Sequence, residues 1–362
     1  MIPILKKSLD VLQTEGFRRF ISKSKRNVEN SIERIIFFEK ENVTRLKRLK
    51  NKYQGKRVFL IGNGPSLNLT PLYFLKDEYT MVFNRFNIML ERLNWKPTFY
   101  MVCDSVVAKD MSKEINDIVP MVKYAFFPDI HTDGTNFKKF ILSKENVIWL
   151  QPYFKGFYTN LPYISLGGTV AFAAMQVLIY LGFKEIILLG VDMNYKLHMG
   201  VKNLGKSEIT ALQDDDPNHF DPRYFGKNRS YHQPDQEAVS NMLNSFELAA
   251  KVAKERGVAI LNAGLDSAVT CFKKVDFYSL FNFDEKEIFR LFFECLGMNS
   301  NYTSISSAFP QITEIKDISE WDNSKKEIMV NEDLAKRIIK DKIFKYIPYG
   351  PIKGMFIFKK RI

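Results

Sequence analysis

The sequence predicts an α/β protein with a Rossmann-like, doubly wound and mostly parallel sheet. A short apolar run at 57–61 stops at a glycine, further apolar runs of strand length follow it, and a helix-like run at 167–182 lies between two of them. Parallel strands that are buried on both faces are nearly continuous in apolar residues, and alternating strands and helices are typical of such sheets.

Three regions are expected along the chain. Residues 1–55 form a basic amphipathic helical segment, residues 56–281 form the Rossmann-like catalytic domain, and residues 282–362 form a helical C-terminal module. The last boundary is placed where the alternation of strands and helices stops. With 46% hydrophobic residues, the 362-residue chain can bury a large core.

Positive charge is concentrated at the N-terminus. Residues 1–57 hold 16 Lys and Arg against 6 Asp and Glu, which accounts for most of the net charge of +12. Apolar residues recur between Val11 and Leu49 at roughly helical spacing. Such basic amphipathic helices either pack on the rest of the fold or lie on an anionic membrane surface, and a solvated helical face remains an alternative.

Cysteine usage and hydropathy indicate the compartment. Cys103, Cys271 and Cys295 are widely spaced and form no CxxC pair, so neither a disulfide framework nor a zinc site is suggested. A signal-peptide pattern is absent, and so is any run of about 18 apolar residues. We expect a cytoplasmic protein, either free or peripheral on the inner face of the cell membrane.

The elements of the predicted domain follow in order. The expected strands are 57–61, 80–84, 98–104, 124–130, 146–151, 186–192 and 258–264, and the expected helices begin at about 167 and 235. The polar stretch 196–234 is longer than an ordinary connection, and its aromatic residues favour an ordered, functional loop.

The turn after the first strand is predicted to bind the phosphate side of a nucleotide. Gly62 and Gly64 permit a tight turn and close approach to backbone amides, Asn63 offers an amide, and Ser66 a hydroxyl. The third glycine of a dinucleotide fingerprint is missing, and Asn84 stands where an acidic residue would bind ribose, which disfavours NAD. A plain strand-to-helix turn is the alternative.

Other polar residues lie where ligands bind in α/β sheets, at predicted strand ends or helix starts. Their alternatives are helix caps, turns and close helix packing. These candidates are Asn84, Asp104, Asp192, Ser165, Gly167, Gly168 and Thr169.

Among the four histidines, His232 is the best candidate for a general base. It precedes a predicted helix on the 196–234 stretch, and a neutral imidazole suits proton transfer near pH 7. A solvated loop histidine is the alternative. The acidic run Asp214–Asp216 could bind a divalent ion, although such runs are usually solvated. Neither an HExxH nor a P-loop motif occurs.

Together these motifs resemble two related groups of proteins. VFLIGNGPSL, the Asn84 strand end, SLGGTVAFAAMQVLIYLGFKEIILLGVDMNY and His232 are similar to the bacterial sialyltransferases of glycosyltransferase family 42, which have a GT-A-like fold. They also resemble the 6-hydroxymethylpterin pyrophosphokinase-like domain that is present in flagellin-glycosylating motility accessory factors. The resemblance covers about residues 56–281 and is closer to the second group.

The resemblance implies roles for individual residues. Asn63 and Asn84 would hold cytidine monophosphate, and His232 would deprotonate the acceptor hydroxyl. The sialyltransferases carry an arginine before the serine-glycine helix start and a tyrosine after the GxD aspartate, and both are replaced here. Contacts to the donor sugar or the acceptor are therefore expected from other residues, namely Asn194, Tyr195, Arg223, Tyr224, Arg229 and Tyr231.

The first functional hypothesis is an inverting, metal-independent glycosyltransferase without a cofactor. It would move an acidic sugar such as a sialic acid, Kdo or pseudaminic acid from a CMP donor to a glycan or lipid-linked glycan on the bacterial surface, and no nucleic-acid partner is expected. The alternative is an ATP:6-hydroxymethylpterin pyrophosphokinase, in which Mg²⁺ would bind Asp104, Asp192 and the 214–216 run. A third possibility is a nucleotide-sensing or scaffold protein without catalysis.

Overall fold

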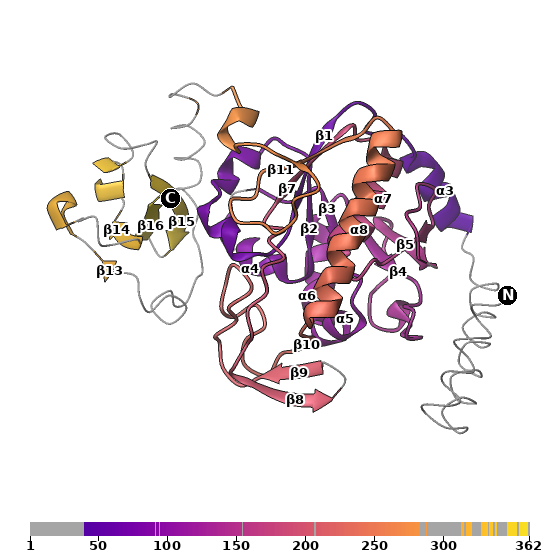
Figure 1. Cartoon of the computed structure of the whole chain (residues 1–362), viewed down its shortest axis with the longest axis horizontal. Helices are drawn as coiled ribbons and strands as arrows, with labels where there is room; N and C mark the ends of the chain where they lie inside the picture. Colours follow the sequence, from indigo (N-terminus) through magenta and orange to yellow (C-terminus); the bar gives the residue numbers. More distant parts are fainter. Residues whose placement is uncertain are drawn as a thin grey trace.

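The computed structural model describes residues 40–282 except 91, 94, 154, 206 and 207, together with short stretches between 287 and 360. Nine strands form one sheet in the order β12-β11-β7-β1-β2-β3-β4-β5-β6, and all its pairs are parallel (Figure 1). The predicted Rossmann-like fold class is therefore confirmed. The strands are β1 (Arg57–Ile61), β2 (Thr80–Phe83), β3 (Phe99–Met101), β4 (Tyr124–Pro128), β5 (Val147–Pro152), β6 (Tyr163–Ile164), β7 (Glu185–Leu189), β11 (Ala259–Asn262) and β12 (Lys273–Lys274).

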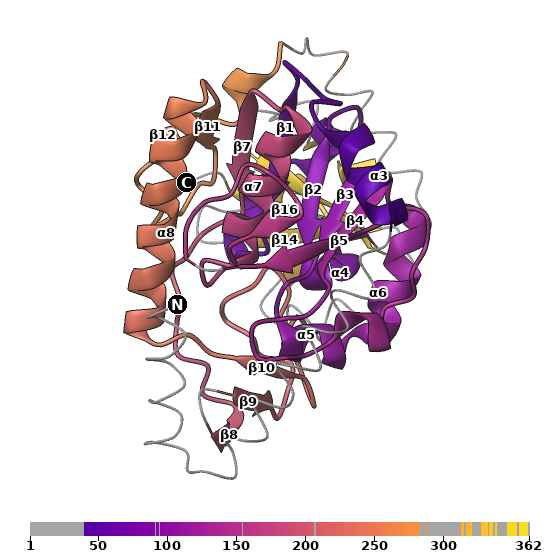
Figure 2. The same cartoon turned by 90° about the vertical axis from the view of Figure 1, so that its right-hand side faces the viewer.

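Helices and short 3-10 turns cover both faces of the sheet, and its central strands are mostly apolar and buried. In β1, Val58 and Leu60 pack on one face while Phe59 and Ile61 pack on the other. Figure 2 shows α7 (Val170–Leu181) in front of the sheet and α8 (Gln236–Glu255) beside β11. The remaining turns and helices are η1 (Pro65–Leu69), η2 (Leu72–Leu75), η3 (Asn84–Phe86), α4 (Asn87–Leu90), α5 (Ser105–Asp110), α6 (Ser112–Ile118), η4 (Val119–Met121), η5 (Phe137–Lys139) and η6 (Tyr278–Leu280).

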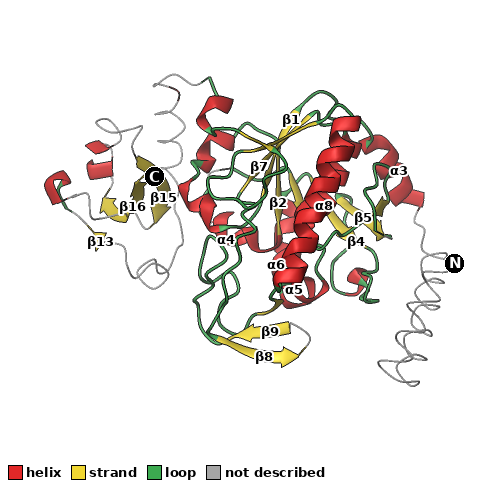
Figure 3. Cartoon of the chain, viewed as in Figure 1, coloured by secondary structure: helices red, strands yellow, loops and turns green. Residues whose placement is uncertain are grey.

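The long stretch between β7 and α8 is ordered, as its aromatic residues indicated. It is mostly loop in Figure 3, but it contains an antiparallel sheet of β8 (Val201–Gly205), β9 (Glu208–Ala211) and β10 (Ser230–His232). This sheet lies at the end of the parallel sheet where α5 also lies (Figure 2). The stretch is therefore well placed to cover the carboxyl ends of the strands.

The expected boundary at residue 55 does not separate two packing units. Helix α3 (Lys40–Leu49) lies on the sheet domain, because its Leu46 and Leu49 are buried with Tyr53 in the core. Residues 1–39 fall outside the described part, so their predicted basic helices and membrane contact stay predictions. None of the helices described here is long and apolar enough to cross a membrane.

The prediction of a helical C-terminal module is wrong for most of its described residues. These form a four-stranded sheet in the order β13-β14-β16-β15, from β13 (Thr313–Glu314), β14 (Glu327–Asn331), β15 (Tyr346–Ile352) and β16 (Met355–Lys360). Short helical turns, among them η7 (Ile318–Glu320), accompany it. The run rich in Phe and Ile at 355–360 pairs as an antiparallel strand with both neighbours, which its β-branched and aromatic residues favour.

Candidate functional site

The topology creates a crevice at the carboxyl edge of the sheet. From β1 the chain adds strands outward to β6 and then returns at β7, on the other side of β1. Ligands bind in α/β sheets at such a switch point. A cleft of about 620 Å³ opens there, within the range of small-molecule sites. The 62–66 turn, the residues after β2, β3 and β7, the start of α7 and parts of the 196–234 stretch line this cleft.

The glycine turn is built for close backbone packing rather than as an open ring of amides. The amides of Gly62 and Gly64 donate to Leu189 O and Gly190 O at 2.7 and 2.8 Å. A Cβ at Gly62 would lie 2.3 Å from Gly190 O, so only glycine fits. The expectation that these two amides cradle phosphate is therefore corrected, because they are already bonded inside the protein.

Asp192 occupies the position where a phosphate was expected. Its carboxylate accepts hydrogen bonds from the Ser66 amide at 2.9 Å and the Ser66 hydroxyl at 2.5 Å. A Cβ at Gly64 would lie 2.2 Å from the same carboxylate. Burial raises the pKa of Asp192, although the bonds from Ser66 act in the opposite direction. Ser66 and Asp192 line the cleft, but they bind each other.

Asn63 and Asn84 bring buried polar atoms to the cleft. Asn63 is 8% exposed, and its Nδ2 donates to Phe83 O at 3.2 Å. In the described part of the chain, Oδ1 of Asn63 and Oδ1 of Asn84 are buried without a hydrogen-bond partner, and both residues line the cleft. A buried acceptor without a donor costs free energy, so a hydrogen-bond donor that enters the cleft, from water or from a ligand, would be favourable at these two atoms.

The backbone at the cleft is also strained. Asn84 has φ +46° and Met193 has φ +58°, a region that non-glycine residues seldom adopt. Both residues follow a strand and line the cleft. Such outliers concentrate at functional sites, and the sequence gives no direct signal for them.

Asp104 and His232 come together from distant parts of the chain. Asp104 caps α5 by accepting from the amides of Val106 and Val107, and its second oxygen lies 3.3 Å from His232 Nδ1. Burial opposes ionisation of Asp104, but the hydrogen bonds from His232 and Val107 outweigh it and lower its pKa. The side chain of His232 is 41% exposed at the cleft, so an acceptor can reach it. The alternatives from the sequence were a helix cap for Asp104 and a solvated loop histidine for His232. In the structure, Asp104 caps α5 and also contacts His232.

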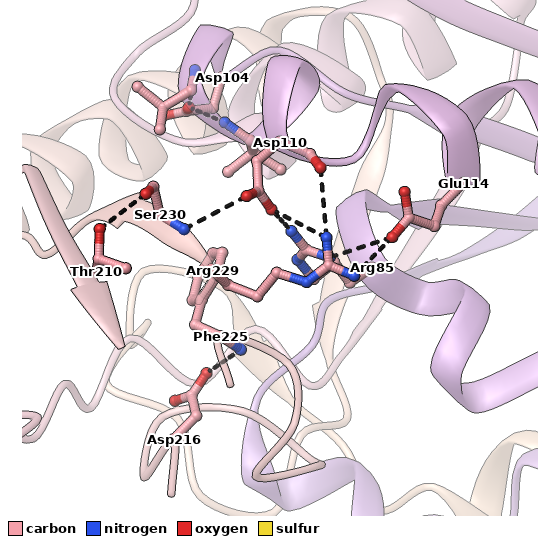
Figure 4. Close-up of polar contacts among 11 residues, drawn as sticks. Arg85, Asp104, Asp110, Glu114, Thr210, Asp216, Phe225, Arg229 and Ser230 are labelled. Atoms are coloured by element: carbon pink, nitrogen blue, oxygen red, sulfur yellow. Dashed lines mark hydrogen bonds and ion pairs between the residues drawn. The ribbon is translucent and has the colours of Figure 1, made fainter. Parts of the chain in front are cut away.

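The strand that carries His232 is held by a cluster of ions. Figure 4 shows Arg85 and Arg229 converging on Asp110 and Glu114. Arg229 reaches Glu114 at 2.7 Å, and the Ser230 amide reaches Asp110 at 3.5 Å. Burial and the neighbouring Arg229 lower the pKa of Arg85 to about 10. This Arg85 cluster attaches β10 to α5, whose other end carries Asp104.

Two arginines that were expected at the donor sugar lie elsewhere. Arg229 belongs to the Arg85 cluster, and Arg223 binds Asp221 at 2.9 Å beside the buried Arg92. Neither lines the cleft. The expectation is corrected, because both guanidinium groups are engaged by carboxylates of the protein itself.

The start of α7 contributes only part of what the sequence suggested. Gly168 and Thr169 line the cleft, and Thr169 caps the helix at Ala171 N. Ser165 and Gly167 do not line it. The backbone of Ser165 exchanges two hydrogen bonds with the side-chain amide of Gln176. Gly167 has φ +56°, and a Cβ there would lie 2.2 Å from the ring of Phe172. For these two residues, packing replaces the expected contact with an anion.

The remaining candidates for the sugar or the acceptor do reach the cleft. Asn194, Tyr195, Tyr224 and Tyr231 all line it. Asn194 also donates to Asp266 at 3.1 Å, and the hydroxyl of Tyr231 bonds to His198. Their binding roles stay predictions.

The carboxylates proposed to hold Mg²⁺ are not gathered. Asp214 accepts from Lys227 N, Asp215 contacts His198 Nε2 at 2.6 Å, and Asp216 binds His219. Over the described ranges, no three His, Cys, Asp or Glu side chains are grouped as metal ligands. The acidic run therefore serves three separate loop contacts.

One pair, with its histidine in the cleft, was missed from the sequence. His219 Nδ1 lies 2.7 Å from Asp216 Oδ2, and its ring stacks on Tyr224 with the centroids 3.9 Å apart. The spacing of three residues was visible in the sequence. Nothing in a loop sequence, however, shows that two such side chains meet.

A family model described as "6-hydroxymethylpterin diphosphokinase MptE-like" matches residues 31–197. This match confirms the resemblance to the pyrophosphokinase-like group over that range. It begins before residue 56, in keeping with the packing of α3 on the sheet. No curated protein matches the chain.

Solved structures of two glycosyltransferases resemble the chain. The MAf glycosyltransferase from Magnetospirillum magneticum AMB-1 is 13% identical, with 70% of this chain and 41% of that chain covered and a TM-score of 0.39. The sialyltransferase CstII from Campylobacter jejuni with cytidine-5'-monophosphate is 12% identical, with 64% and 89% covered and a TM-score of 0.37. With CMP-3FNeuAc it is 15% identical, with 63% and 90% covered and a TM-score of 0.38. The chain thus spans less than half the length of the MAf glycosyltransferase.

Proposed function

Starting from an MptE-like match at 31–197 and a cleft at the switch point of the sheet, we propose that the protein is an inverting glycosyltransferase with a CMP-activated acidic sugar as donor. The acceptor is a glycan or a lipid-linked glycan of the bacterial surface. The observation that carries the proposal is His232, which Asp104 holds in the cleft that contains Asn63. This arrangement provides a general base for the acceptor and buried polar side chains for the donor.

The buried polar side chains of Asn63 and Asn84 suit the nucleoside part of the donor. Oδ1 of Asn63 and Oδ1 of Asn84 are buried acceptors, so each calls for a donor such as a ribose hydroxyl or the amino group of a base. The start of α7 also lines the cleft. The amides and the positive end of the dipole at a helix N-terminus favour a phosphate there.

The pair of Asp104 and His232 supplies proton transfer. With the Nδ1 proton directed at the carboxylate, Nε2 carries the lone pair that accepts the proton of the acceptor hydroxyl. As the acceptor oxygen bonds to the anomeric carbon, the bond from that carbon to the phosphate oxygen breaks and CMP leaves. Attack opposite the leaving phosphate inverts the anomeric centre.

A release assay tests this function. The protein is mixed with CMP-sialic acid, CMP-Kdo or CMP-pseudaminic acid and a surface-glycan acceptor, in EDTA, and free CMP is measured. We expect CMP release from one donor and a loss of about 10²- to 10⁴-fold in kcat for His232→Ala. Full activity of His232→Ala would contradict the proposal, as would a lack of turnover with every donor.

A second candidate function is a Mg²⁺-dependent ATP:6-hydroxymethylpterin pyrophosphokinase, which the description of the matching family model favours. Its reaction would need Mg²⁺ bound by carboxylates near the nucleotide. The same assay with ATP, 6-hydroxymethylpterin and Mg²⁺ distinguishes the two. Product that forms only with Mg²⁺ and ATP supports the kinase.

A further inference from the structure

A second histidine in the cleft has a better-formed carboxylate partner than His232. His219 Nδ1 lies 2.7 Å from Asp216, compared with 3.3 Å between His232 and Asp104. The Asp216 side chain is only 1% exposed. Burial alone would raise the pKa of Asp216, but His219 and two backbone amides outweigh it and lower the pKa. This buried carboxylate at Nδ1 fixes the orientation of the His219 ring.

The position of His219 is fixed from several sides. Asp216 also accepts from the amides of Asn218 and Phe225, at 2.8 and 3.0 Å, and Figure 4 shows the second of these bonds. The ring of His219 stacks on Tyr224 with an interplanar angle of 5°. Few rotamers remain for the imidazole, so a ligand pays little entropy to meet it.

His219 is also joined to the 62–66 turn. The next residue, Phe220, donates its amide to Asn63 O at 2.9 Å, and Asn68 donates to Phe220 O at 2.9 Å. The backbone of Asn63 thus holds the segment that bears His219. A nucleotide in contact with the side chain of Asn63 would lie beside this segment.

The charges of the cleft show why a histidine donor matters there. Of the described residues that line the cleft, none is an arginine and Lys196 is the single lysine. Asp104, Asp192, Asp235 and Asp266 all line it. A phosphate near the turn would face the Asp192 carboxylate and two amides that are already bonded. Besides Lys196, the basic side chains that can meet a phosphate are therefore those of the histidines that line the cleft.

We infer that His219, held in place by Asp216 at Nδ1, binds the phosphate of the nucleotide donor through Nε2–H. The inference rests on the proposed function and adds the group that stabilises the leaving nucleotide. No covalent bond to His219 forms. Its hydrogen bond to the phosphate strengthens as negative charge develops on the departing CMP, while His232 takes the acceptor proton. The two histidines divide leaving-group stabilisation and base catalysis between them.

The test compares nucleosides with their 5'-monophosphates by isothermal titration calorimetry. The phosphate increment is the ratio of the Kd of a nucleoside to the Kd of its monophosphate, measured for cytidine, adenosine and uridine. His219→Asn keeps an amide that can bond to Asp216 but removes Nε2. A lost charged hydrogen bond should lower the increment by about 10- to 100-fold, with nucleoside affinity unchanged.

His131→Asn is the matched control, because His131 also lines the cleft beside a carboxylate, Asp133 at 3.1 Å. This variant should keep the increment. The inference is overturned if His219→Asn keeps the phosphate increment, or if the unaltered protein shows none. It is also overturned if the increment is lost in Lys196→Met but not in His219→Asn. If the phosphate increment depends on His219 for another nucleotide but not for CMP, the role of His219 is supported and a cytidine donor is rejected.

Discussion

Replacement of Asn63 should weaken nucleotide binding without changing the stability of the protein. In the protein without ligand, Asn63→Ala loses one hydrogen bond to Phe83 O but also removes a buried oxygen without a partner. Each effect is worth about 1 kcal/mol and they oppose each other. We predict that the free energy of unfolding changes little, while the Kd of the nucleotide rises about 10-fold. Urea unfolding and calorimetry measure the two quantities.

Asn146→Ala is the matched control. Its Nδ2 donates to Val119 O and Val122 O, at 2.7 and 2.9 Å, and it does not line the cleft. This variant should lose stability and keep nucleotide affinity. The opposite pattern, in which Asn63→Ala is unstable but binds normally, would remove Asn63 from the site.

At Asp104 we predict an effect on catalysis without an effect on donor binding. Asp104→Asn keeps an oxygen that can cap α5, but it no longer carries the charge that orients His232 and stabilises its protonated form. Steady-state kinetics should show a decrease of kcat of about 10-fold or more, with the KM for the donor nearly unchanged. If KM rises while kcat holds, Asp104 is a donor-binding residue instead.

The sequence indicates residues of the cleft where position in the fold decides. Asn63 in the glycine turn, Asn84 and Asp104 at strand ends and His232 before a helix all line the cleft, and their roles stay predictions. Position is not enough where a side chain's partner decides. Arg229, for example, was expected at the donor sugar. Its partners Asp110 and Glu114 lie more than 100 residues earlier in the chain, and nothing in the sequence shows that they reach it.

At the level of elements, the Arg85 cluster is predicted to position β10 for catalysis. Asp110→Asn weakens the attachment of Arg85, Arg229 and Ser230 while leaving the cleft wall intact. We expect faster amide hydrogen exchange over β10 and a lower kcat, with an unchanged Kd for the nucleotide. Exchange confined to α5 and α6, with normal turnover, would show that the cluster only stabilises the helices.

The strand pattern of the parallel sheet was readable from the sequence because both faces of its strands are buried. The uninterrupted apolar runs 58–61 and 186–189 lie within β1 and β7. β8, β9 and β10 were not predicted, since a small sheet over a cleft has mixed polarity. The C-terminal strands were missed because short Phe-rich runs fit a helix or a strand equally well.

At the scale of the whole molecule, acid should destabilise the protein. Asp104, Asp216 and Asp221 have lowered pKa values in the folded state, because charged or hydrogen-bonded partners outweigh burial. Their stabilisation is present above the unfolded pKa of about 3.9 and is lost as pH falls through the lower folded values. Asp192, with a raised pKa, acts in the opposite direction.

Urea unfolding at a series of pH values checks this prediction. The free energy of unfolding should hold steady above about pH 5 and decline steeply below about pH 4. Asp221→Asn, which leaves the buried Arg92 without its charged partner, should be less stable at pH 7 and should show a shallower decline. Stability that increases towards pH 3 would contradict these assignments.

The central claim is that the switch-point cleft binds a cytidine monophosphate donor without a metal. The direct test is calorimetric titration of CMP and ATP into the full chain, each with EDTA and with Mg²⁺. The account predicts that CMP binds equally well in both conditions, more tightly than ATP, and that Asn63→Ala weakens it about 10-fold. Absence of CMP binding, or tighter binding of ATP that requires Mg²⁺, would contradict it.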